Sequence, residues 1–413
     1  MSLIKPFRGI RPAPGRAGEI AAPPYDVLSA EEARARAHGK PNSFLHISKA
    51  EIDLPPEIDH YSPQVYAKSR ENFDCMIREA VLRQDDTPCY YAYRLVMGSH
   101  SQTGLVAAAS VADYDTNRIR KHEFTRPDKE DDRVRQIEAL NAQTGPVLLT
   151  HPDAPEVDAI LAQASSGAPD ADVTADDGIR HSIWVIRDAA VLQRLTFLFD
   201  AMPALYIADG HHRSAAASRV AAARHARNSH HSGEEDYNYF LSVIFPHRQM
   251  RIMDYNRVVK DLNGLSAMGF LARLTERFVV SISAPRYRPM QRGEFSLYLP
   301  GQWYRLTIHP HLIPTEDPVA RLDVSLLSDN LLGPVLGIKD LRRDKRIDFV
   351  GGIRGLEELE RRVDSGEMAA AFALHATDME DLMSVADAGE VMPPKSTWFE
   401  PKLADGLVSH VLD

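Results

Sequence analysis

The stretch ALYIADGHHRSAAASRVAAARHA, residues 204–226, changes character twice within a few positions. Its first five residues are apolar, which is typical of a short strand buried on both faces. From Ser214 onward the Ala-rich sequence favours a helix. The residues between these two segments carry most of the chemistry, and we predict that they form a strand-to-helix turn: Asp209, Gly210, His211, His212 and Arg213.

A turn of this kind is suited to binding an anion. Backbone N–H groups at a helix start have no intrahelical partner and lie at the positive end of the helix dipole. Gly210 lets the backbone approach a ligand closely, and Arg213 can hold a phosphate through two hydrogen bonds. Each cation placed here without an anion costs a few tenths to about 1 kcal/mol. We therefore predict a phosphate site made by Gly210, His211, His212, Arg213 and Ser214.

Other interpretations of the turn stay open. Asp209 can cap the helix while the basic residues are merely solvated, or its carboxylate can hold a magnesium ion that shields phosphate charge. A zinc site is less favoured, because neighbouring side chains on a helix diverge and no Asp, Glu or Cys stands at ligand spacing. The histidines in question are His211, His212, His225, His230 and His231.

Composition limits the class of protein. The chain has 413 residues, 44% hydrophobic and 26% charged, which predicts a soluble protein of two or three domains. A net charge of −10 argues against coating nucleic acid, and the sequence holds no apolar run long enough to span a membrane. The first residues lack the apolar core of a signal peptide. The two cysteines, Cys75 and Cys89, suit a reducing cytoplasm.

The pattern along the chain predicts four regions. Residues 1–60 are rich in proline and are expected to pack on the body of the protein, and residues 61–254 form the phosphate-binding core. From about Met253 the pattern changes to a smaller α+β domain or insert over 255–350. Residues 351–413 are expected to be helical and to return toward the site.

Local patterns predict several elements inside these regions. Ser29 is expected to cap a short helix, because two glutamates follow it in the first turn. A helix is predicted over 63–83, with Pro63 in its first turn. Strands over 89–97 and 104–112 are expected to form a hairpin with a five-residue loop.

The segment KHEFTR, residues 121–126, follows this hairpin. In an extended conformation, alternation sends Lys121, Glu123 and Thr125 to one face. A cation, a carboxylate and a hydroxyl that converge there can bind a phosphate and deprotonate a substrate hydroxyl, as phosphoryl transfer requires. The plainer interpretation is an exposed strand end with a Lys/Glu pair worth less than about 1 kcal/mol.

Several segments together resemble the domain of unknown function 1015 family, which is related to the ParB/sulfiredoxin-like nucleotide-binding fold. The run 206–213 is similar to the phosphate-binding turn of that fold. The resemblance implies an α+β fold with a ParB/sulfiredoxin-like mixed sheet core. Proteins related to this fold include free-serine kinases that use ATP, ADP or pyrophosphate. The other matching segments are 6–9, 23–27, 43–46, 121–125 and 392–397.

The resemblance also implies roles for residues. Glu123 is the candidate base, because the related kinases use a glutamate, while Lys121 would neutralise the phosphate and Thr125 would orient it. Asp209 would act with them and hold Mg²⁺. A C-terminal loop is expected to close over the phosphate through Lys395, Ser396 and Thr397. Substrate contacts are expected from His122, Arg126 and Arg133, although the charged helix that holds Arg133 can equally be a solvated face.

These observations predict a small-molecule kinase that transfers a phosphoryl group to a hydroxyl, with free L-serine giving O-phosphoserine as the leading reaction. The alternative is a nucleotide- or effector-binding regulator on the same fold without phosphotransfer. P-loop and Rossmann motifs are absent from the sequence. The expected partners are a phosphoryl donor and a hydroxy amino acid in the cytoplasm, without nucleic acid or membrane. Homodimer formation stays open.

Overall fold

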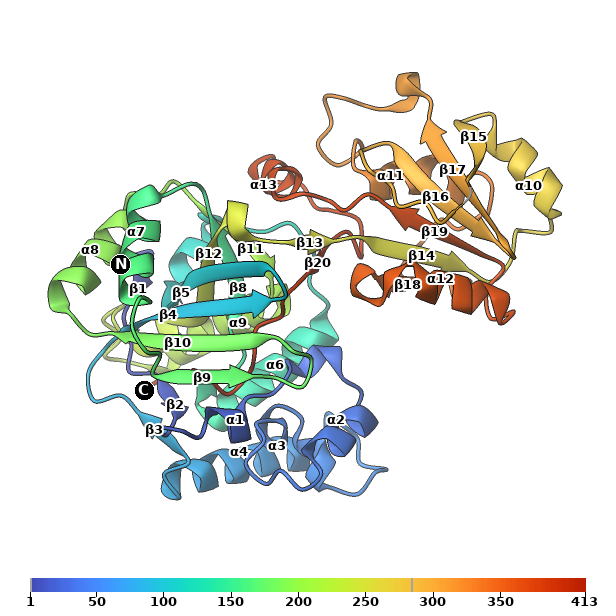
Figure 1. The fold of residues 1–413 in the computed structure, drawn as a ribbon. Coiled ribbons are helices and arrows are strands. Elements are labelled where there is room, and N and C mark those ends of the chain that lie inside the picture. Colours follow the sequence, from blue (N-terminus) through green and yellow to red (C-terminus); the bar gives the residue numbers. More distant parts are fainter. Residues whose placement is uncertain (1, 284) are drawn as a thin grey trace. The chain divides into compact units, whose positions relative to one another are not determined.

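The chain leaves one folding unit and later returns to it. The computed structural model describes residues 2–283 and 285–413. Unit 1 comprises Met1–Met250 and Pro401–Asp413, and unit 2 comprises Arg251–Glu400. Each unit is of the α+β type, and unit 1 is built on a mixed central sheet (Figure 1). Within the described residues, no helix combines the length and the apolar character needed to cross a bilayer.

The central sheet of unit 1 contains nine strands of the described chain. They are β1 (Ile4–Lys5), β4 (Tyr90–Met97), β5 (His100–Ser110), β6 (Ile119–Arg120), β8 (Val147–His151), β9 (Ala171–Thr174), β10 (Arg180–Ile186), β11 (Leu205–Asp209) and β12 (Tyr239–Pro246). Eight of them follow the order β6-β11-β8-β12-β5-β4-β10-β9, and β1 pairs with β5. The pairs β6/β11 and β8/β12 are parallel, and the other pairs are antiparallel.

The main core of unit 1 lies between one face of this sheet and its helices. Alternate residues along the strands, such as Leu205 and Ile207 of β11, share one buried cluster with residues of α7 (Pro155–Ala164), α8 (Ala189–Asp200) and α9 (His211–Arg227). The α9 side of this cluster is made of small residues, Ala215–Ala217 and Ala221 among them. Small side chains let this helix lie close to the sheet, which fixes where its first turn sits.

A second cluster is built from the N-terminal region and its neighbours. It joins α2 (Ala30–Ala37) and α3 (Leu45–Ser48) to α4 (Pro63–Arg78) and to the end of α6 (Pro127–Leu140). The smaller elements of this part of unit 1 are β2 (Ile10–Pro12), α1 (Ala17–Ile20), β3 (Leu82–Gln84), α5 (Val111–Asp115), β7 (Ala142–Gln143) and β21 (His410–Val411). Ser29 caps α2 in a complete capping box with Glu32, as the sequence predicts. The C-terminal strand β21 pairs with β7, so both ends of the chain lie in unit 1.

Some local predictions need correction. The hairpin of β4 and β5 pairs Met97 with His100, so its turn contains two residues and not five. The helix α4 ends at Arg78 instead of reaching residue 83, because the backbone turns at Ala80, which has φ 54°. Residues 121–126 do not continue as a strand after β6.

Unit 2 has its own sheet, antiparallel throughout, in the order β15-β17-β16-β19-β14-β18. Its strands are β14 (Tyr255–Val259), β15 (Phe278–Ser283), β16 (Glu294–Leu299), β17 (Gln302–Ile308), β18 (Ile347–Gly351) and β19 (Ala370–Leu374). Its helices are α10 (Ala267–Leu274), α11 (Asp323–Leu327), α12 (Gly355–Asp364) and α13 (Met379–Asp387). A short pair, β13 (Ile252–Met253) and β20 (Trp398–Phe399), joins the two ends of the unit.

Residues 351–413 are expected to be helical, and this expectation is wrong for Ala370–Leu374 (AAFAL), which form the strand β19. Alanine favours helices, but all five residues of β19 are buried, and the strand lies between β16 and β14 in the middle of the sheet. Tertiary burial therefore outweighs local propensity here.

Candidate functional site

The centre of the candidate site is the junction between β11 and α9. Gly210 precedes the helix and has φ 102° and ψ 26°, in the left-handed region that glycine adopts without a Cβ clash. A Cβ at this position would also lie 3.1 Å from Nε of Arg213. The helix begins at His211, three residues earlier than the sequence predicts, because the turn at Gly210 already redirects the backbone. His211, His212 and Arg213 therefore form its first turn.

Parallel pairing explains why a second segment reaches this junction. The strand β6 runs parallel to β11, with Arg120 beside Tyr206. Carboxyl ends of parallel neighbours meet at the same edge of a sheet. Residues 121–126, which follow β6, therefore continue beside the residues that follow Tyr206.

The two histidines of the junction fix this second segment in place. The backbone N–H of His122 donates to Nε2 of His211 at 3.4 Å, and the backbone N–H of Arg126 donates to Nε2 of His212 at 3.1 Å. The neighbouring side chains thus diverge, as predicted, and each contacts a different part of the segment. Burial lowers the pKa of His212, and the neutral ring is the form that accepts a hydrogen bond at Nε2.

His122, Glu123 and His211 form a compact cluster. The His122 and His211 rings meet edge to face with centroids 4.5 Å apart. Nδ1 of His211 lies 3.9 Å from Oε2 of Glu123, whose side chain is 45% exposed, whereas His122 and His211 are only 2% and 4% exposed. Burial lowers the pKa of His122 to about 4, and burial together with His122 lowers the pKa of His211 well below its ordinary value. Both rings are therefore neutral, and Glu123 is the member of the cluster that solvent reaches.

Asp209 is surrounded by positive charge. Its carboxylate lies 3.1 Å from Nζ of Lys402 and 3.8 Å from the Arg213 guanidinium. Burial alone would raise the pKa of Asp209, but Lys402 and Arg213 outweigh this and lower it below its ordinary value. The predicted role of Asp209 as a Mg²⁺ ligand does not fit this environment, because two cations already neutralise its single carboxylate and would repel a third.

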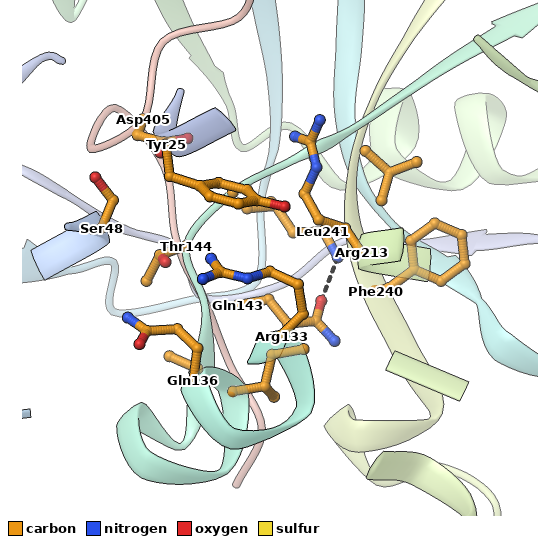
Figure 2. A pocket seen from close by; sticks show the side chains of 14 residues that line it. Tyr25, Ser48, Arg133, Gln136, Gln143, Thr144, Arg213, Phe240, Leu241 and Asp405 are labelled. Carbon is orange, nitrogen blue, oxygen red and sulfur yellow. Dashed lines mark hydrogen bonds between the residues drawn. The ribbon is translucent and has the colours of Figure 1, made fainter. Parts of the chain in front are cut away.

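Arg213 also lines a pocket of unit 1, together with Tyr25, Arg133 and Asp405 (Figure 2). Figure 2 shows the Arg133 guanidinium against the ring of Tyr25, 3.8 Å from its centroid. Asp405 lies at the same pocket with Oδ1 lacking a hydrogen-bond partner among the described residues. Burial raises the pKa of Asp405 to about 7, partly against the effect of Arg213. Two buried arginines and a carboxyl group therefore converge beside the junction.

The other residues predicted around Glu123 have separate partners. Lys121 donates to the carbonyl of Tyr114 at 2.8 Å and lies 3.8 Å above its ring, and Thr125 donates to Glu130. Without the extended conformation, the expected convergence of Lys121, Glu123 and Thr125 on one face is not formed.

The remaining predicted residues are also placed. His122 is buried, whereas Arg126 is exposed and pairs with Asp128. The hydroxyl of Ser214 donates to the carbonyl of His211. The predicted C-terminal loop belongs to unit 2, where Arg257 donates to the carbonyl of Lys395 and the Ser396 hydroxyl donates to Pro393; Thr397 lies in the same loop. The contribution of this loop to the phosphate site stays a prediction.

Sequence reasoning missed Lys402, Asp405 and Tyr25. They come from the two ends of unit 1, and the backbone of Asp405 pairs with Ala22 near the N-terminus. No motif marks Lys402 or Asp405, which the chain brings to the junction only after folding, whereas Tyr25 lies in the segment 23–27 that carries part of the family resemblance. The C-terminal cation that contacts the junction is Lys402, which was not predicted, and not Lys395.

Comparison with known proteins gives one family. The family model described as "Protein of unknown function (DUF1015)" matches residues 4–325. No curated protein matches the sequence. Among solved structures, a mutant of a free serine kinase in complex with AMP is similar over 71% of this chain and 87% of its own, with 15% identity and a TM-score of 0.36. A conserved hypothetical protein from Pyrococcus furiosus is similar over 75% and 95%, with 14% identity and a TM-score of 0.34. SbnI with a C-terminal truncation, from Staphylococcus aureus, is similar over 73% and 85%, with 10% identity and a TM-score of 0.35.

Proposed function

We propose that this chain, which belongs to the DUF1015 family, is a small-molecule kinase that transfers a phosphoryl group to a hydroxyl, with free L-serine as the first candidate acceptor. The observation that carries the proposal is the position of Glu123. Its exposed carboxylate lies 3.9 Å from His211, the first residue of α9. A candidate base and the proposed phosphate site therefore share one edge of the sheet.

The proposed division of labour follows from the contacts. Backbone N–H groups of the first turn of α9 and the guanidinium of Arg213 would hold the transferred phosphate, because both are donors with positive character. Glu123 would accept the proton of the substrate hydroxyl. Phosphoryl transfer depends mostly on such positioning and charge neutralisation. Mg²⁺ would enter with ATP, ADP or pyrophosphate as part of the donor, because Asp209 is already paired with Lys402.

A second candidate function is binding of a nucleotide or other phosphorylated effector without transfer. It is favoured by the position of Lys121, which contacts Tyr114 and is thereby held away from the role predicted for it. In this case Arg213 and Arg133 would serve recognition alone.

Turnover separates the two functions. Purified protein is given L-serine, Mg²⁺ and, in turn, ATP, ADP or pyrophosphate, and O-phosphoserine is followed by ³¹P NMR. A Glu123→Gln variant should turn over about 10²- to 10⁴-fold more slowly and should still bind the donor. The matched control is Glu156→Gln, an exposed glutamate of α7 that pairs with Arg194.

Three outcomes decide the matter. Product that depends on Glu123 supports the kinase. Donor binding without product, across a panel of hydroxy amino acids, supports the regulator. If no donor binds, or if Glu123→Gln and Glu156→Gln behave alike, the kinase proposal is wrong.

A further inference from the structure

The cluster of His122, Glu123 and His211 brings two imidazoles and one carboxylate together, and a phosphate site does not require this combination. The ligand-type atoms of these three residues all lie within 4.8 Å of one another. We infer that the cluster binds a divalent transition-metal ion, with Zn²⁺ as the representative of its class. Two imidazoles and one carboxylate are ligands that such ions accept, whereas Mg²⁺ prefers oxygen ligands.

The first supporting observation is the state of His122. The side chain is 2% exposed, and within the described chain neither of its ring nitrogens has a hydrogen-bond partner. Buried polar groups are nearly always satisfied, so an unpartnered one needs an explanation. The backbone carbonyl of Ile207 is close enough to raise the pKa of His122 slightly against the effect of burial, but it is outside hydrogen-bonding geometry. A metal ion at one ring nitrogen would satisfy this side chain.

The second observation is the gap between His211 and Glu123. Nδ1 and Oε2 are 3.9 Å apart, which is too long for a hydrogen bond of about 2.7–3.2 Å. Two ligand atoms that share one ion at about 2.1 Å each lie roughly 3.4–4.2 Å apart, depending on the angle between them. The observed separation therefore leaves room for an ion.

The hydrogen bond of His211 sets a condition for metal binding. Imidazole binds a metal ion through a ring nitrogen that carries no proton, and the ring stays neutral. Nε2 of His211 accepts from the backbone N–H of His122, which places the ring proton on Nδ1. Binding at Nδ1 would move this proton to Nε2, so the hydrogen bond from the backbone of His122 would be given up and no proton would need to leave the chain.

Among the residues that the structure describes, the cluster offers three protein ligands, which leaves a position for water or for a phosphate oxygen on the side where Glu123 is exposed. The inference does not rest on phosphoryl transfer, because metal binding is measured without any substrate. If both proposals hold, an ion on Glu123 removes the base, and Zn²⁺ should inhibit the kinase reaction.

The test is direct metal binding to the full-length chain. Apo-protein is titrated with Zn²⁺ by calorimetry, metal content is measured after desalting, and Co²⁺ is used as a spectroscopic probe of the ligands. The wild type should bind one ion per chain at the cluster. Loss of a ligand in Glu123→Gln should weaken binding by at least about tenfold, since even outer partners of metal ligands contribute 10- to 100-fold.

A surface histidine pair supplies the matched control. The rings of His225 and His231 are stacked at 3.8 Å, and His231 lies 3.3 Å from Glu235, so this pair is the obvious place for adventitious zinc. A His231→Ala variant should leave the affinity unchanged. The Co²⁺ complex of the wild type should show d–d bands that are altered in Glu123→Gln, a change at a partly exposed side chain that does not disturb the core. Absence of binding, or binding that depends on His231 and not on Glu123, overturns the inference.

Discussion

The helices α9 of unit 1 and α12 of unit 2 have first turns with opposite patterns of charge. In unit 2, α12 carries Glu357 and Glu358 in its first turn and Arg361 and Arg362 in its last, which complements the helix dipole at both ends. In unit 1, α9 has no acidic residue in its first turn and begins with two histidines and Arg213. The acidic residues in the first turn of α12 stabilise that helix, whereas the basic residues in the first turn of α9 do not stabilise theirs.

The difference in charge between the two first turns is smaller than the sequence suggests. Burial lowers the pKa values of His211 and His212, so Arg213 is the residue of that turn that keeps a full charge, and Asp209 lies 3.8 Å from it. The expectation that three cations require an anion is therefore too strong. The first turn of α9 still combines one largely buried arginine with two neutral imidazoles and with backbone N–H groups at the positive end of the helix dipole. This combination suits an anion better than it suits a plain helix.

The largest expected effect is at Arg213. Arg213→Gln should weaken pyrophosphate binding by about 100-fold, because hydrogen bonds to a charged group contribute about 1.5–3 kcal/mol. The counterpart in α12, Arg361→Gln, removes an exposed charge and should leave binding unchanged. Calorimetric titration with pyrophosphate measures both. Equal affinities in the two variants would contradict the assignment of α9 as the anion site.

The glycines at the two helix starts give the next effect. Gly210 has φ 102° and Gly355 has φ 72° with ψ 175°, so alanine at either position should cost about 2 kcal/mol of unfolding free energy. Only Gly210→Ala should also weaken pyrophosphate binding, since its Cβ would displace the Arg213 guanidinium. Urea denaturation and calorimetry separate the two readouts. Loss of pyrophosphate binding in Gly355→Ala would contradict the assignment of the anion site to the start of α9.

A third comparison concerns one carboxyl group from each unit. Asp209 stays ionised beside Lys402 and Arg213, whereas burial raises the pKa of Asp323 in unit 2 to about 7, and the Asp323 carboxyl accepts a hydrogen bond from the backbone N–H of Gly293. The folded state therefore holds a proton on Asp323 that the unfolded chain has lost above about pH 4. The free energy of unfolding should fall as the pH rises from about 4 to about 7 and then stay level.

Replacing Asp323 by asparagine tests the direction of this pH dependence. Asp323→Asn should be more stable than the wild type at pH 8 by about 1–2 kcal/mol, and the gain should shrink toward pH 5. Urea unfolding followed through Trp303 and Trp398, the tryptophans of unit 2, measures it. A gain of the same size at both pH values would show that Asp323 does not titrate in this range.

The smallest effect is expected in the first turn of α12. Glu357→Gln should lower the stability of unit 2 by a few tenths of a kcal/mol, because it removes an exposed charge that complements the dipole and pairs with Arg286. The companion change in α9, His212→Glu, should weaken pyrophosphate binding by a smaller factor than Arg213→Gln does, because the imidazole that it replaces is neutral. If His212→Glu binds pyrophosphate normally, the first turn of α9 does not contact the anion.

Much of the local structure could be predicted from the sequence because its signals are local. The helix over Pro155–Ala164 and the strands Tyr239–Pro246 and Glu294–Leu299 follow from periodicity and apolar runs. The capping box at Ser29 follows from residue types three positions apart. The helical expectation for Ala370–Leu374 failed because the position of a strand inside a sheet is not a local property.

The features of the candidate site also divide into those set by neighbouring residues and those set by tertiary contacts. The sequence by itself determined that a buried strand changes to a helix within Asp209–Ser214, because apolar pattern, glycine and alanine content are properties of neighbouring residues. Only the tertiary structure decided that Lys402 pairs with Asp209, that His122 is buried against His211, and that Lys121 lies on Tyr114. Parallel pairing of β6 with β11 and the return of the chain at Pro401 create these contacts, and burial then sets the charges of the groups that meet.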